Sequence, residues 1–208
     1  DALPIFEAIN ITKKYRNTLA LNQVSMSVMQ GDIYGFIGEN GAGKTTMIRL
    51  LTGLAEPTTG KIALFGESNK KLAKQRERIG CIIESPSLYL DMTAYENLEV
   101  QRLQRGIPGK GCIDNALALV GLKDTGKKKA KDFSLGMRQR LALAIALLGN
   151  PEFLVLDEPI NGLDPTGIIE LRNLLKRLNK ERGITILISS HILTELHQLA
   201  NRYGILHE

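Results

Sequence analysis

Residues 38–46, GENGAGKTT, constrain what this chain can fold into more than any other segment. They match the phosphate-binding pattern G-x-x-x-x-G-K-[ST], which indicates a phosphate site only where it lies between a strand and a helix. An apolar run at 33–37 predicts that strand, and apolar residues at helical spacing over 47–54 predict the helix. A glycine-rich turn at a helix N-terminus directs backbone N–H groups and about half a positive charge at an anion. The alternative is a turn that binds nothing; the lysine and threonine in register instead favour a site for a nucleoside triphosphate.

Two side chains of this loop have specific expected roles. Lys44 is expected to reach the β- and γ-phosphates, and the hydroxyl of Thr45 is expected to ligate Mg²⁺. The rest of the loop is expected to approach the same ligand through its backbone N–H groups. The predicted phosphate-binding residues are Gly38, Glu39, Asn40, Gly41, Ala42, Gly43, Lys44, Thr45 and Thr46.

An acidic segment follows another apolar run farther along the chain. Four apolar residues at 153–156 end in Asp157 and Glu158, as expected of a strand that delivers carboxylates to a metal. Asp157 is predicted to hold Mg²⁺ directly or through water, and Glu158 to polarise the attacking water as general base. A polar strand end is the alternative for such a segment alone. Downstream of a phosphate-binding loop, the metal and catalytic roles are favoured.

Strand and helix signals alternate on either side of a helical stretch. Strands are predicted at 5–11, 20–28, 33–37, 61–65, 81–83, 153–156, 184–189 and 203–207. Helices are predicted at 69–78, 113–120 and 192–200, and after the capping residues Thr93, Ser134 and Asp164. Because strand–helix alternation is typical of a parallel sheet, we predict an α/β fold. We expect a single domain, 1–208, with a core formed by 1–83 and 151–208 and a helical part over about 84–150.

Composition and charge limit the classes of protein that this chain can belong to. Its 208 residues, with 43% hydrophobic and 24% charged, suit a soluble domain with a sizeable core, and no apolar run approaches the length of a membrane span. The net charge of +5 fits nucleic acid, an anionic membrane surface or an ordinary basic surface. The densest basic cluster, 127–131, has no interleaved aromatic residues, which favours a solvated loop; no nucleic-acid partner is expected. Cys81 and Cys112 lack metal-ligand spacing and are expected to be reduced and structural.

Further segments resemble those of ATP-binding cassette (ABC) proteins. Residues 133–137, FSLGM, resemble the L-S-G-G-Q signature of that family, 161–164 resemble its D-loop, and 189–191 resemble its switch-histidine segment. Tyr15 stands where the family stacks an aromatic ring on adenine. The resemblance covers essentially the whole chain, in the family's order and spacing. It implies ATP and Mg²⁺ as cofactors, and a P-loop NTPase (RecA-like) core with an N-terminal antiparallel β subdomain and an inserted α-helical subdomain.

The resemblance also implies a partner subunit and further site residues. Ser134 and Gly136, at the start of a predicted helix, are expected to grip the γ-phosphate of ATP bound to the other subunit. This implies a head-to-tail dimer, with a second copy of the chain or with another cassette subunit. His191 is expected to contact the γ-phosphate and to help hold Glu158; the alternative is a surface histidine. For Tyr15 the alternative is a partly exposed loop tyrosine.

The chain departs from the family pattern in two places. Leu135 and Met137 replace a glycine and a glutamine of the signature, while its serine and its second glycine remain, so phosphate contact is expected to survive. Glu84 stands where the family usually has a glutamine that touches Mg²⁺ and the attacking water. Its carboxylate is predicted to ligate Mg²⁺ or to take a cation from the partner; the alternative is a solvated glutamate. Together with FSLGM, Glu84 is similar to the ATP-binding subunits of lantibiotic-immunity and bacitracin-resistance exporters.

The resemblance implies the ATPase subunit of such an exporter, bound at the cytoplasmic face of the membrane. A separate multi-spanning permease is expected to dock a cytoplasmic helix in a groove near residues 84–98. A soluble cassette ATPase that acts on ribosomes or DNA is the alternative, and the single cassette with a short interval before the signature disfavours it. A catalytically degenerate regulatory subunit is disfavoured because the predicted catalytic and metal-binding residues are all present.

Overall fold

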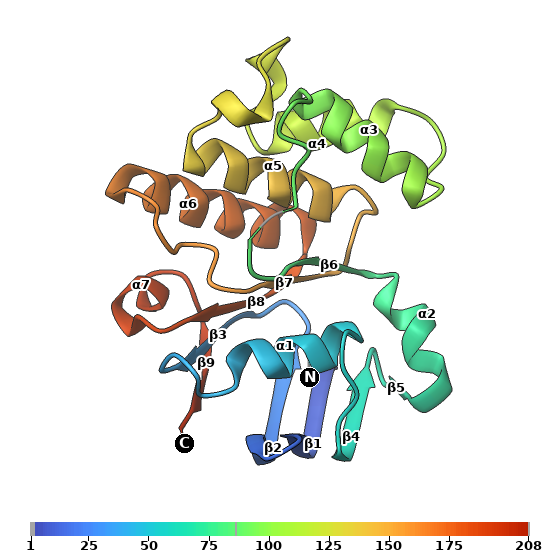
Figure 1. Cartoon of the computed structure of the whole chain (residues 1–208), viewed down its shortest axis with the longest axis vertical. Helices are drawn as coiled ribbons and strands as arrows, with labels where there is room; N and C mark the ends of the chain where they lie inside the picture. Colours follow the sequence, from blue (N-terminus) through green and yellow to red (C-terminus); the bar gives the residue numbers. More distant parts are fainter. Residues whose placement is uncertain (1–2, 86, 208) are drawn as a thin grey trace.

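A five-stranded parallel sheet forms the centre of the computed structural model, which describes residues 3–85 and 87–207 (Figure 1). The strand order is β6-β7-β8-β3-β9, and each neighbouring pair is parallel. The strands are β6 (Ile79–Ile82), β7 (Phe153–Leu156), β8 (Thr185–Ser190), β3 (Ile33–Gly38) and β9 (Arg202–Leu206). Because all five point the same way, the residues after their carboxyl ends meet at one edge of the sheet.

Alternating side chains bury the two faces of this sheet in two different clusters. On β7, Leu154 and Leu156 belong to the cluster on one face, and Phe153 and Val155 to the cluster on the other. This alternation is the period of two that a strand imposes. Since both faces are covered, the strand is apolar throughout, which explains the unbroken hydrophobic run before the acidic segment.

On one face of the parallel sheet lies a helix, α1 (Lys44–Thr52), followed by a second, antiparallel sheet (Figure 1). The order of the antiparallel sheet is β2-β1-β4-β5. Its strands are β1 (Pro4–Tyr15), β2 (Thr18–Met29), β4 (Thr59–Leu64) and β5 (Glu67–Ser68). Side chains of α1 and of both sheets therefore form one buried cluster, and the predicted antiparallel β region at the N-terminal end is present.

Helices from residues 94–182 lie on the other side of the parallel sheet, in the same buried cluster as Leu154 and Leu156 (Figure 1). They are α3 (Ala94–Gln104), α4 (Gly111–Leu119), α5 (Leu135–Leu147) and α6 (Pro165–Arg182), with the short segments η2 (Lys123–Thr125) and η3 (Ala130–Asp132) between α4 and α5. The predicted caps are confirmed: the side chains of Thr93, Ser134 and Asp164 accept backbone N–H bonds at the starts of α3, α5 and α6. One buried cluster runs from α3–α5 through α6 to the sheet, so the boundaries proposed for a helical subdomain stay a prediction.

Two of the predicted helices were wrong in extent. The helix expected at 69–78 ends earlier and consists of η1 (Asn69–Lys71) followed by α2 (Leu72–Arg76); its first residue, Asn69, has a left-handed conformation with φ of 56° directly after β5. The helix expected at 192–200 is a five-residue helix, α7 (Leu193–His197), followed by a turn that Leu199 and Ala200 close on Leu196. Across the described residues, no helix combines the length and the hydropathy that a membrane span requires.

Candidate functional site

The loop at 39–43 joins the carboxyl end of β3 to the start of α1 and has the tight geometry that its glycines allow. Gly43 is the N-cap of α1 with φ of 102°, and a Cβ atom there would lie 2.5 Å from the carbonyl oxygen of Ala20. Only glycine tolerates both the positive φ and this close approach. The first N–H groups of α1 lack partners within the helix and are available to an anion in the loop.

The charge of Lys44 is held inside this loop. Its side chain is 5% exposed, and Nζ donates to the carbonyl oxygens of Gly38 and Glu39, the latter at 3.0 Å. The same nitrogen lies 3.5 Å from Oε1 of Glu158. A phosphate that enters the loop would replace carbonyl oxygens with charged ones, which bind an ammonium group more strongly.

Thr45 and Asp157, two of the predicted Mg²⁺ ligands, are in direct contact. The hydroxyl of Thr45 donates to Oδ2 of Asp157 over 2.8 Å, and Asp157 is 4% exposed. A hydroxyl and a carboxylate suit Mg²⁺, which takes oxygen ligands and in phosphate-transfer sites uses one or two carboxylates plus substrate phosphates. Consistent with so sparse a ligand set, no cluster of three His, Cys, Asp or Glu side chains occurs in the described part of the chain.

Glu158 and His191, the predicted general base and switch histidine, form a pair. Nδ1 of His191 lies 2.9 Å from Oε2 of Glu158. Because an ionised carboxylate only accepts hydrogen bonds, Nδ1 carries the proton when Glu158 is charged. Glu158 itself has a left-handed backbone, with φ of 48°, which is strained for a residue other than glycine. Such strain is common at functional sites, where the surrounding structure maintains it.

One buried hydroxyl that sequence reasoning assigned no role connects these groups. Ser189, at the end of β8, donates to Oδ1 of Asp157 over 2.6 Å and accepts a hydrogen bond from the backbone N–H of Glu158 over 2.9 Å. The segment 189–191 was singled out only through the family resemblance. The missing signal was the strand order, because β8 lies between β7 and β3 and brings this serine beside the acidic residues.

Ser134 and Gly136 occupy the start of α5, apart from the phosphate-binding loop. Ser134 caps the helix by accepting the N–H of Met137 at 3.2 Å, and a Cβ atom at Gly136 would meet only the Ser134 hydroxyl, at 4.0 Å. Among the described residues, no hydrogen bond or ion pair joins Ser134 to 38–46. This helix end is therefore open toward solvent within one chain.

Tyr15 and Glu84 lie outside the connected group. Tyr15 is 40% exposed at the end of β1, with the ammonium of Lys13 4.7 Å from its ring centroid. A cleft of about 450 Å³ lies between β2 and the phosphate-binding loop. The sequence did not predict this cleft. The 61% exposed carboxylate of Glu84 pairs with Arg49, and neither Thr45 nor Asp157 is among its recorded partners. Adenine stacking by Tyr15 and metal binding by Glu84 stay predictions.

Comparison with known proteins identifies the family. The family model described as "ABC transporter" matches residues 21–161. The chain belongs to the ABC transporter family. It is 52% identical over 205 residues to the bacitracin transport ATP-binding protein BcrA of Bacillus licheniformis, an alignment that covers 98% of this chain and 67% of that protein. It is 44% identical over 199 residues to the lantibiotic transport ATP-binding protein SrtF of Streptococcus pyogenes, covering 96% of this chain and 85% of the relative.

Solved structures place the fold among ABC cassettes. The ABC transporter component cbiO1 of Clostridium perfringens has a TM-score of 0.89 at 28% identity and covers 99% of this chain and 85% of its own. A second similar structure is a dimeric ATP-binding cassette in a post-hydrolysis state, bound to ADP and Pi. Its TM-score is 0.84 at 26% identity, and the match covers 97% of this chain and 94% of the other chain. The P-loop NTPase fold predicted from the sequence is confirmed, and the chain is an ATP-binding and ATP-hydrolysing subunit of an ABC transporter.

Proposed function

We propose that this chain is the Mg²⁺-dependent ATPase subunit of an exporter of antimicrobial peptides. The connected contacts of Lys44, Thr45, Asp157, Ser189, Glu158 and His191 carry the enzymatic part of this proposal. The names of BcrA and SrtF, relatives at 52% and 44% identity, support the class of cargo. These names favour transport over the alternative of action on ribosomes or DNA.

The chain's own residues suffice to bind and orient the phosphates of ATP. The loop N–H groups and the start of α1 receive the phosphate oxygens, and Lys44 turns from the Gly38 and Glu39 carbonyls toward the β- and γ-phosphates. Mg²⁺, held by Thr45 and Asp157, would neutralise charge on the phosphates. Once Lys44 has turned to the phosphates, Glu158 loses its cationic neighbour at 3.5 Å and is free to accept a proton from water.

His191 orients the base in this scheme. Its Nδ1–H donates to one carboxylate oxygen of Glu158 and leaves the other, Oε1, to face the attacking water. The same side chain is proposed to touch the γ-phosphate, which links the presence of ATP to the position of the base. Tyr15 and the cleft beside β2 are proposed to receive the adenine and ribose, since the cleft borders the loop at Gly41 and Ala42.

The second half of each site is proposed to come from another cassette subunit. Ser134 and Gly136 form an anion site at the start of α5 that faces no phosphate in its own chain. In a symmetric dimer each copy can present this helix end to the ATP of the other, so two sites form at once. The dimeric cassette structure at a TM-score of 0.84 supports this assembly.

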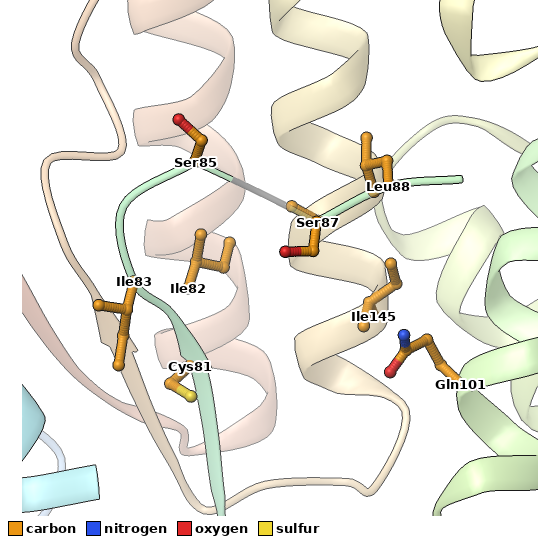
Figure 2. A pocket seen from close by; sticks show the side chains of 9 residues that line it. Cys81, Ile82, Ile83, Ser85, Ser87, Leu88, Gln101 and Ile145 are labelled. Atoms are coloured by element: carbon orange, nitrogen blue, oxygen red, sulfur yellow. The ribbon is translucent and has the colours of Figure 1, made fainter. Parts of the chain in front are cut away.

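A separate permease is proposed to dock where the structure has a small pocket of about 200 Å³ (Figure 2). Its lining side chains come from the end of β6, the segment that follows it, α3 and α5, and include Ile83, Ser87, Gln101 and Ile145. The pocket has room for one or two side chains rather than for a whole helix. It lies in the region predicted from the sequence to receive a cytoplasmic helix, and docking there would hold the chain at the cytoplasmic face of the membrane.

The proposal is tested with Glu158→Gln in the full-length protein. Loss of the base is expected to lower kcat by roughly 10²–10⁴-fold while ATP binding is preserved. Glu152→Gln is the matched control, because it makes the same change directly before β7, at the opposite end of the strand, where the side chain forms its hydrogen bonds with Arg78. Steady-state ATPase rates and nucleotide binding measure both variants, and near-normal turnover of Glu158→Gln contradicts the catalytic assignment.

The transport part of the proposal is tested on the same variant. Glu158→Gln protein with bound ATP is recovered from the cells that naturally express it, and the co-purifying proteins are identified. A multi-spanning membrane protein, together with ATP-dependent resistance to bacitracin or a lantibiotic, is the expected result. Ribosomal or DNA-bound partners without a permease would overturn the transporter assignment and leave the ATPase.

A further inference from the structure

Ser189 stands out among the buried polar residues because both partners of its hydroxyl belong to the proposed catalytic acids. The side chain is fully buried, with a relative exposure of 0%. Its single proton goes to Oδ1 of Asp157 at 2.6 Å, and its oxygen accepts the N–H of Glu158 at 2.9 Å. The hydroxyl thus donates to the side chain of Asp157 and accepts from the backbone of Glu158, and these two hydrogen bonds fix its orientation.

The bond to Asp157 decides which carboxylate oxygen meets the phosphate-binding loop. With Oδ1 held by Ser189, Oδ2 is the oxygen that accepts the Thr45 hydroxyl at 2.8 Å. A carboxylate anchored at one oxygen cannot rotate about its side-chain bonds without losing that hydrogen bond. Groups that orient metal-binding carboxylates in this way tune metal affinity and activity although they do not touch the metal.

The bond to Glu158 acts on its backbone. Glu158 has φ of 48°, a left-handed conformation that is strained for a residue with a side chain, and its N–H is held by the Ser189 hydroxyl. This conformation turns the chain sharply after β7 and sets the direction of the Glu158 side chain toward Lys44 and His191. Loss of the hydroxyl would leave this N–H without its partner and allow the backbone to relax.

We propose that Ser189 is a positioning residue for ATP hydrolysis, which holds Asp157 and Glu158 in a fixed relation to each other. The inference rests on the proposed roles of Asp157 as metal ligand and Glu158 as base. It adds a residue on β8, the strand between β7 and β3, that couples the two roles. A purely structural role is the alternative, since a buried hydroxyl can also serve only to satisfy neighbouring polar groups.

The same strand provides a control that separates the two possibilities. Thr185, at the other end of β8, is equally buried at 0% exposure, and its hydroxyl accepts the backbone N–H of Gly31 at 2.9 Å. Removal of either hydroxyl leaves a backbone N–H without its partner, so both variants should lose stability; Ser189→Ala should lose more, because it also removes a hydrogen bond to a carboxylate. Of these two hydroxyls, only that of Ser189 contacts Asp157 and Glu158.

The test compares Ser189→Ala with Thr185→Val in the full-length ATPase, by steady-state kinetics and thermal unfolding. Ser189→Ala is expected to lower kcat by about 10–100-fold, the usual loss for a residue that orients metal ligands. The KM for ATP should change little, and the Mg²⁺ concentration for half-maximal activity should rise. Thr185→Val should also lower Tm, by less than Ser189→Ala does, with kcat and Mg²⁺ dependence unchanged. Ser189→Cys, which keeps a weaker donor and acceptor of similar shape, should give an intermediate kcat.

A double variant distinguishes failure of this inference from failure of the proposed function. In the Glu158→Gln background, Ser189→Ala should cause a smaller fold-loss of kcat than in the wild type, because part of its effect acts through the base. Equal losses of kcat in Ser189→Ala and Thr185→Val, or an unchanged Mg²⁺ dependence, would show a structural role and overturn the inference. Normal turnover of Glu158→Gln alone would contradict the proposed function. Slow turnover of Glu158→Gln together with normal turnover of Ser189→Ala would contradict only the inference about Ser189.

Discussion

The carboxyl edge of the parallel sheet and the start of α5 differ in how complete they are within one chain. At the sheet edge, Lys44, Thr45, Asp157 and Glu158 already contact one another or a shared neighbour. At the start of α5, Ser134 caps its own helix, and within the described residues no hydrogen bond or ion pair joins it to the phosphate-binding loop. Both regions lie at helix N-termini, which favour anions, and the acids proposed for hydrolysis belong to the first.

This difference shows what a second subunit has to add. In the proposed scheme, residues of one chain bind phosphate and metal at the sheet edge, whereas the start of α5 acts only on a ligand that another chain brings. Gly136 leaves its backbone unobstructed, since a Cβ atom there would have no neighbour closer than 4.0 Å. We therefore propose that the two regions are complementary halves of one site, each of which a symmetric dimer would supply twice.

The largest effect is expected from a mixture of two variants, each of which damages a different half of the proposed site. Lys44→Ala is expected to lower kcat by roughly 10²–10³-fold, since it removes a charged donor to the phosphates. Ser134→Ala is expected to lower it by roughly 10–10²-fold, since it removes a hydrogen bond to a charged group. Mixed in equal amounts, the two proteins should regain about a quarter of the wild-type rate, because random pairing makes half of the dimers mixed and each has one intact site.

ATPase rates of each variant and of the mixture measure this prediction. Thr93→Ala is the control for Ser134→Ala, because Thr93 caps α3 as Ser134 caps α5. Both should lose about 1 kcal/mol of stability through loss of a helix cap, and only Ser134→Ala should lose activity. A mixture no faster than the average of its components would show that the two halves do not come from different chains.

The sheet edge could be predicted from the sequence more fully than the rest of the molecule. The phosphate-binding loop, the acidic strand end and the helix caps are local patterns, so each specifies its own geometry; Thr93 with Glu96 forms the predicted capping box in full. What could not be predicted depends on neighbours distant in sequence. Ser189 meets Asp157 across 32 residues only because β8 lies beside β7.

Local strain and surface pairing limited the prediction elsewhere. The stretch expected to form one helix begins with Asn69 in a left-handed conformation, and β5 before it is only two residues long. Glu84 is predicted to ligate Mg²⁺ or to take a cation from the partner subunit; its carboxylate pairs with Arg49 on α1, 35 residues away in sequence, and its role stays a prediction. A charge on a loop has many candidate partners, and the sequence pattern does not choose among them.

Glu84 lies two residues after the end of β6, before the segment that leads to α3. Glu84→Ala removes the pair with Arg49, in which both side chains are at least 40% exposed, so ATP affinity should change by less than about fivefold. Transport per ATP hydrolysed, measured with the permease in vesicles, should fall more than ATP binding does. Arg49→Ala is the control, since it removes the ion pair but keeps the carboxylate. Equal losses of binding and transport would instead support a role at the metal.

The smallest expected effect tests whether polar pairs at the opposite ends of β6 and β7 matter to the site. Arg78 and Glu152 directly precede these strands and form two hydrogen bonds of 2.8 Å, and the Arg78 guanidinium lowers the pKa of the Glu152 carboxyl below its ordinary value of 4.5. A lowered pKa means that the pair stabilises the fold above about pH 4.5, and that this contribution disappears as the pH falls through the lowered pKa.

Glu152→Gln should therefore lower the free energy of unfolding at pH 7 by less than about 1 kcal/mol, because both side chains are more than a third exposed and solvent screens the pair. The difference from wild type should vanish in acid, and kcat should stay unchanged at all pH values where the protein is folded. Urea unfolding at several pH values and ATPase assays measure both. A fall in kcat would mean that the amino ends of these strands influence the acids at their carboxyl ends. The contacts around Asp157 would then depend on the whole length of the sheet rather than on its carboxyl edge alone.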